Sequence, residues 1–248
     1  MNGAAEAAQP APATGARAPV AVDLNAPLPR ALLALTFSTG LIDAASFLGL
    51  GRVFSANMTG NVVLLGFGIA GARGLPTVSP LIAAATFVAG AGLGGLVVRR
   101  FAEPTRAFVA IVAAETLIAG AGAVLAASVH VRANTAYSDT IVALLALAMG
   151  ARSASVRSLG VPDLSTTVLT MTLTGLTADS RLAGGSGRAT PHRAAAVVAM
   201  LAGAIAGALL LRTTLALPLA LAAALALITC VSYARAHQRG EEVRSRGG

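Results

Sequence analysis

The chain has 248 residues, of which 56% are hydrophobic and 11% are charged, and its formal net charge is +8. This composition excludes a water-soluble domain, because soluble domains carry about 25% charged residues. The basic residues are all arginines and lie mostly between apolar runs, where they orient membrane helices. We therefore expect a lipid bilayer as partner and no nucleic acid. The absence of lysine and the excess of Ala and Gly suggest a GC-rich bacterial genome.

The chain divides into a long apolar region and two polar tails. Residues 1–29 are rich in Ala and Pro and lack the apolar core of a signal peptide, which predicts a disordered tail. Residues 30–233 form the predicted transmembrane domain, and residues 234–248 form a basic tail expected near anionic lipid headgroups. Eight apolar segments lie in the domain, at about 31–50, 54–72, 80–98, 107–128, 139–157, 165–180, 193–211 and 213–233. We expect an all-α polytopic protein of the bacterial inner membrane with both termini cytoplasmic.

Landmarks in the first half of the domain recur in the second half. Gly90 and Gly94 match Gly203 and Gly207, 113 positions later, and other matches occur at offsets of 110 to 115. We therefore predict two repeats of about 110 residues, 30–128 and 139–233. Glycines four positions apart form a flat helix face for close packing. In membrane proteins, such repeats are common in transporters, with the site at the repeat interface.

The second and sixth segments are short, hydroxyl-rich and contain the steps Thr59-Gly60 and Thr174-Gly175. Interrupted backbone at membrane depth has to be buried in protein or line a cavity. If all eight segments span, the arginines divide into 11 inside and 7 outside, whereas two re-entrant segments give 14 and 4. The second division fits the positive-inside rule better and places the two repeats in opposite orientations. We favour six spans plus two re-entrant Thr-Gly segments, with eight spans as the alternative.

Asp43 and Glu115 lie mid-way along apolar segments, and Arg152 lies late in the fifth segment. A charge at bilayer depth costs about 2.5–3.5 kcal/mol on insertion scales, so it usually faces a partner or water. Asp43 and Arg152 occupy nearly equivalent repeat positions, which makes an ion pair between them plausible. The functional interpretation makes Asp43 and Glu115 candidates for proton coupling. The structural alternative is a buried ion pair that fixes helix register.

The two Thr-Gly segments supply amide and hydroxyl groups that would suit a polar solute path. Their hydroxyls would otherwise bond back to carbonyls within a helix. The candidate substrate-binding residues are Asp43, Asn57, Thr59, Gly60, Asn61, Arg152, Thr174 and Gly175.

The sequence offers no support for an enzyme. It contains no nucleophile–base constellation and no phosphate-binding Gly loop followed by Lys. Cys230 is the single cysteine, and the three histidines are far apart in the sequence. We therefore expect no metal, no cofactor and no catalytic residue.

The stretch from Gly40 to Gly66 resembles the YoaK-like family of bacterial transmembrane proteins of unknown function (DUF1275). The matching positions are Gly40, Asp43, Ala44, Ser46, Gly51, Val53, Phe54, Ala56, Asn57, Met58, Thr59, Gly60 and Asn61. Ala148-Met149-Gly150 and the run from Thr166 to Gly175 look like second-half signatures, so the resemblance covers about 30–235. A Gln-Asn pair usual in the family is replaced here by Arg152 and Ser153. The resemblance implies an integral membrane protein and supplies no reaction.

Two hypotheses follow from these patterns. The first is an inner-membrane transporter or permease for an unidentified small solute, with its site between the two repeats. The second is a non-transporting membrane scaffold or accessory subunit, in which the glycine faces would pack the copies of a homo-oligomer together.

Overall fold

The computed structural model describes residues 26–160, 169–180, 183–184 and 190–246, with side chains described as far as residue 239. Most of the predicted disordered tail, residues 1–25, lies outside this range. The described elements are helical: α1 (Pro27–Ala45), the π-helical turn η1 (Ser46–Gly51), α2 (Met58–Ile69), α3 (Val78–Arg100), α4 (Pro104–Ser128), α5 (Ala136–Ser158), α6 (Leu169–Ala178), α7 (Thr190–Leu211) and α8 (Ala216–Arg246).

Six of these helices are long and apolar enough to cross a membrane, which confirms the polytopic all-α prediction. They are α1 with η1, α3, α4, α5, α7 and α8. The helices α2 and α6 have 12 and 10 residues. At 1.5 Å per residue they extend only about 15–18 Å, too short for a hydrocarbon core of about 30 Å. Within the described residues, the structure therefore has six candidate spans and two short helices, and not eight spans.

Contacts between connections show which helix ends lie together. At one end of the bundle, the Arg52 guanidinium donates to the carbonyl of Gly74 at 3.3 Å, and the Asn134 amide donates to Leu50 at 3.5 Å. At the other end, His237 approaches Glu103 at 3.6 Å. Because Arg52 precedes α2 and Gly74 follows it, the segment between them enters and leaves at one end. This is the re-entrant geometry expected for the first Thr-Gly segment.

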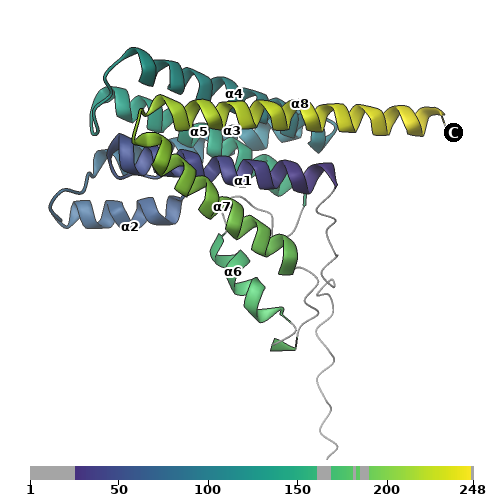
Figure 1. Cartoon of the computed structure of the whole chain (residues 1–248), viewed down its shortest axis with the longest axis horizontal. Coiled ribbons are helices and arrows are strands. Elements are labelled where there is room, and N and C mark those ends of the chain that lie inside the picture. Colours follow the sequence, from purple (N-terminus) through teal and green to yellow (C-terminus); the bar gives the residue numbers. More distant parts are fainter. Residues whose placement is uncertain (1–25, 161–168, 181–182, 185–189, 247–248) are drawn as a thin grey trace, which may run out of the picture.

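The two most extensive helix crossings in the domain are α3 with α5 and α1 with α7, followed by the packing of α4 against α8. Figure 1 shows α7 crossing α1 obliquely, and α8 projecting well beyond the bundle as helix into the predicted basic tail. Each crossing joins a helix from one half of the sequence to a helix from the other. Outward side chains on α3 and α7, such as Val88, Leu96, Val198 and Leu201, are exposed, as expected for lipid-facing surfaces.

The four predicted packing glycines lie at these crossings. A Cβ on Gly203 would collide with the Phe37 carbonyl on α1, and a Cβ on Gly90 would collide with the Leu147 carbonyl on α5. A Cβ added to Gly207 would lie 2.9 Å from the Leu41 carbonyl oxygen, and one added to Gly94 would lie 2.6 Å from the Ala151 carbonyl oxygen. Both helices of each crossing therefore approach at backbone distance, where only glycine fits.

Candidate functional site

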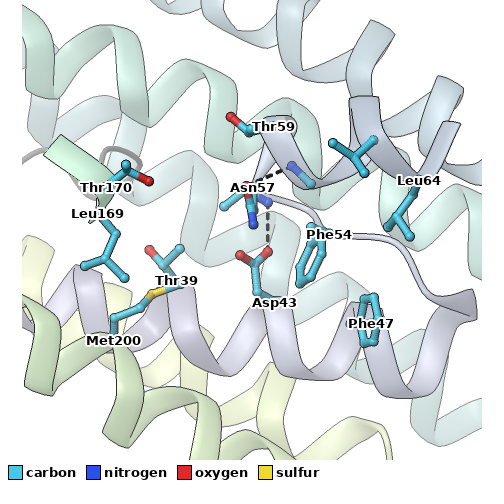
Figure 2. A pocket seen from close by; sticks show the side chains of 13 residues that line it. Thr39, Asp43, Phe47, Phe54, Asn57, Thr59, Leu64, Leu169, Thr170 and Met200 are labelled. Atoms are coloured by element: carbon cyan, nitrogen blue, oxygen red, sulfur yellow. Dashed lines mark hydrogen bonds between the residues drawn. The ribbon is translucent and has the colours of Figure 1, made fainter. Parts of the chain in front are cut away.

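A cleft of about 580 Å³ opens where α1, α2, α6 and α7 meet. Its polar lining comes from Thr39 and Asp43 on α1, the start of α2, and Thr170 at the start of α6. Figure 2 shows Asp43 facing Asn57 across the cleft, with Thr170 on one side and the rings of Phe47 and Phe54 on the other. The first turns of two short helices from different halves of the chain therefore face one space.

Asp43 is the charged residue among the described side chains that line the cleft. It is 5% exposed, and its Oδ1 accepts hydrogen bonds from the backbone amides of Ser55 at 3.0 Å and Ala56 at 2.9 Å. These bonds hold residues 52–57, the non-helical lead-in segment before α2, against α1. Within the described residues, Oδ2 has no hydrogen-bond partner, so one carboxylate oxygen is left for the cleft.

The start of α2 provides three of the predicted residues, Asn57, Thr59 and Gly60, to the cleft lining. The Asn57 side chain caps α2 by accepting from the Gly60 amide at 3.1 Å. A Cβ on Gly60 would lie 2.9 Å from the Phe54 ring, so glycine lets the lead-in segment and α2 pack closely. The cap and the close packing explain how so short an element keeps its polar groups in place.

Asn61 was predicted to bind substrate, and the structure places its side chain in hydrogen bonds with Phe54. Its side chain is completely buried, donates to the Phe54 carbonyl at 2.6 Å and accepts from the Phe54 amide at 2.9 Å. The oxygen and the nitrogen of the Asn61 amide thereby both join the lead-in segment to α2. Asn61 shapes the re-entrant segment from behind and is absent from the described cleft lining.

Thr174 and Gly175 were also predicted to bind substrate, and they lie away from the described lining of the cleft. The Thr174 hydroxyl donates to the Thr170 carbonyl at 3.0 Å, the back-bonding expected of a helical threonine. Gly175 packs against the guanidinium of Arg193 on α7, which donates to its carbonyl and to Asp179 at 2.7 Å. In α6 the cleft is met at Leu169 and Thr170, one turn earlier than predicted.

Arg152 is paired with Glu115, and the Asp43–Arg152 ion pair considered from the sequence is not formed. The Arg152 guanidinium donates to Glu115 Oε1 at 2.6 Å, and both side chains are 1% exposed. It also donates to the Thr39 hydroxyl, which in turn donates to the Leu35 carbonyl at 2.8 Å. Arg152 and Glu115 therefore lie behind the cleft wall, and Thr39 is the link between them and the cleft.

Several cleft residues had no signal that identified them in the sequence. Phe47, Phe54 and Met200 supply apolar lining, and Thr39 supplies a hydroxyl. Phe47 and Phe54 stack with ring centroids 4.7 Å apart, which closes the cleft where η1 meets the lead-in segment. Met200 arrives through the α1–α7 crossing, which apolar periodicity does not reveal. Among the described residues, no group of three or more His, Cys, Asp or Glu could hold a metal ion.

Comparisons with known proteins agree with this architecture. The model of the family described as "Protein of unknown function (DUF1275)" matches residues 31–232. The chain is 36% identical over 145 residues to the "UPF0700 transmembrane protein YoaK" of Bacillus subtilis (strain 168), covering 58% of this chain and 64% of that protein. The match therefore spans a little less than two thirds of the relative. No solved structure matches. The chain is a member of the YoaK-like DUF1275 family of transmembrane proteins.

Proposed function

We propose that this membrane protein is a transporter or permease for a small solute and that the cleft beside Asp43 is its solute site. The observation that carries the proposal is the meeting of two half-helices, α2 and α6, by their N-terminal ends at one cleft. In secondary transporters, discontinuous helices of this kind form the site at the interface between repeats. A nearly buried carboxylate at that point adds support, because ionisable groups in spans usually mark substrate or ion paths.

The proposal assigns different roles to the two acidic candidates. Asp43 keeps one carboxylate oxygen for the cleft, so it is the residue we assign to solute contact or proton coupling. Glu115 is engaged by Arg152 and lies outside the described lining, so we assign it to holding α4 against α5. The proposed location is the bacterial inner membrane with both termini in the cytoplasm, since that orientation places most arginines inside.

The proposal is tested by untargeted measurement of small molecules in bacterial cells and their medium. Three strains make the same amount of membrane-inserted protein: wild type, Asp43→Asn and Glu103→Gln. Glu103→Gln is the matched control, because it removes an acid at the far end of the bundle. We expect at least one solute whose distribution across the membrane shifts with wild type and Glu103→Gln and returns to the vector level with Asp43→Asn. Identical distributions in all strains would exclude transport.

The same variants discriminate the scaffold hypothesis. A scaffold in which Asp43 only anchors the Ser55 and Ala56 amides predicts that Asp43→Asn changes no solute distribution. Stable co-purification of a second protein in mild detergent would favour that reading. Asn keeps an acceptor oxygen for Ser55 and Ala56, so the substitution removes the charge with little change in the anchoring contacts.

A further inference from the structure

We infer that the cleft accepts a small solute that carries an ammonium group, held by Asp43. This inference rests on the proposed function and specifies the class of solute. In its ionised form Asp43 provides a negative charge, and the other described residues of the lining are uncharged. The carboxylate is 5% exposed, so its charge is screened little by water and needs a partner when the cleft is filled.

The arginine nearest to the cleft wall is already neutralised. Arg152 donates to Glu115 Oε1 at 2.6 Å and reaches the wall only through the Thr39 hydroxyl. The ion pair as a whole is neutral, and Arg152 interacts electrostatically with Asp43 without forming an ion pair with it. Had Arg152 paired with Asp43, the cleft would have been neutral and a cation would have gained nothing there. The pairing actually observed leaves the Asp43 charge for a ligand.

The apolar lining suits an organic cation better than a bare metal ion. The rings of Phe47 and Phe54 and the thioether of Met200 line the same cleft as Asp43. Aromatic faces attract ammonium groups within about 6 Å of the ring centroid, and apolar walls favour the carbon skeleton that carries them. Thr39, Thr59 and Thr170 add hydroxyls that accept further N–H bonds.

The first turns of α2 and α6 bring partial positive charge, which works against a cation. Each helix end is equivalent to roughly half a unit charge and acts only over its first turn. In α2 this charge is partly satisfied, because the Asn57 side chain accepts from the Gly60 amide. The full charge of Asp43 on the opposite wall therefore decides the sign at its own position. The remaining amide donors suit an acceptor elsewhere on the solute.

Binding by the purified full-length protein in detergent tests the inference without any transport. Three probes share one carbon chain and differ in charge: propylammonium, propionate and propionamide. We expect isothermal titration to give propylammonium a Kd at least about tenfold lower than the other two, as for a charge-assisted hydrogen bond. Asp43→Asn should abolish that preference, and Phe54→Leu should weaken propylammonium binding by about two- to fivefold. Glu103→Gln should change neither.

Equal binding of the three probes, tighter binding of propionate, or no binding of propylammonium would overturn the inference. The wild-type comparison alone decides it, so the inference stays testable even if Asp43→Asn fails to fold. Its failure is also separable from that of the proposed function. A protein that exports or imports an anion would keep the transport role and lose the ammonium class. A protein that binds propylammonium yet shifts no solute would do the reverse.

Discussion

The two helix crossings make matching contacts in the two halves of the chain, whereas the two short helices, α2 and α6, do not. At the crossings, contacts correspond pair by pair. Gly40 faces the Met200 carbonyl, and Gly150 faces the Phe87 carbonyl in the same way. Gly150 lies 110 positions after Gly40, and Met200 lies 113 positions after Phe87. The half-helices correspond only in length and placement. α2 is anchored by Asp43 and Asn61, whereas α6 is anchored by Arg193 reaching from α7.

This difference separates framework from chemistry. The backbone crossings do the same packing in both halves, so they carry no information about the solute. The position equivalent to Asp43, at an offset of 110, is Ser153, whose hydroxyl bonds back to the Met149 carbonyl. Among the described residues, the carboxylate that lines the cleft comes from the first half of the chain, whereas the helix crossings match between the halves. The duplication itself stays a prediction that these paired contacts agree with.

The largest effect is expected from breaking the ion pair that joins the halves. Arg152→Met leaves Glu115 buried without its partner, and removing one member of a buried pair costs about 3–5 kcal/mol. The double variant Glu115→Gln/Arg152→Met should recover most of that loss. Thermal unfolding in detergent measures both. Equal losses in the single and double variants would show that packing of Arg152, and not its charge, matters.

The crossings should respond almost as strongly, and equally in both halves. Gly203→Val and Gly90→Val each place side-chain carbon onto a facing carbonyl, so each should destabilise by about 3 kcal/mol or more. Gly92→Val is the matched control, because nothing lies within 4 Å of its Cβ position. Unfolding temperature and the monodisperse fraction on size exclusion give the answer. A much smaller loss at one crossing would break the correspondence between them.

The anchor of α2 comes next. Asn61→Ala removes two hydrogen bonds to Phe54, at about 1 kcal/mol each, and should loosen the lead-in segment from α2. A buried reporter at Ser55→Cys in a Cys230→Ser background should then react faster with a thiol reagent. The same reporter with Asn57→Ala should react less, since Asn57 is exposed and caps one amide. Unchanged thiol reactivity in Asn61→Ala would mean that Asp43 alone holds the lead-in segment in place.

The smallest effect is expected at the anchor of α6. Asp179→Asn weakens an ion pair whose acidic side chain is 52% exposed, so the loss should stay below about 1 kcal/mol. Arg193 still donates to the Gly175 carbonyl after the change. Unfolding temperature in detergent is again the measurement. A loss as large as that of Asn61→Ala would show that the two half-helices are held with similar strength.

The sequence predicted what depends on composition and local pattern. The six spans follow from apolar length, and the grouping of Asp43 with Asn57, Thr59 and Gly60 follows from their closeness in the chain. The partner of Arg152 depended on how α4 is rotated against α5, which a span with apolar residues on all sides does not reveal. The hydrogen bonds of Asn61 to Phe54 were not predicted, because the sequence does not show whether an amide beside a Thr-Gly step faces the cleft or the backbone of its own segment. Met200 required knowledge of the crossing itself.

The crossings also set the order in which the protein can be completed during synthesis. α1 packs mainly against α7, the second-last helix, so Gly40 has no backbone to meet until nearly the whole chain has left the ribosome. α3 likewise waits for α5. Contacts so distant in sequence form late, because the intervening chain has to be ordered first. A nascent chain that stops after α4 therefore carries glycine faces on α1 and α3 whose partner helices have not yet been made.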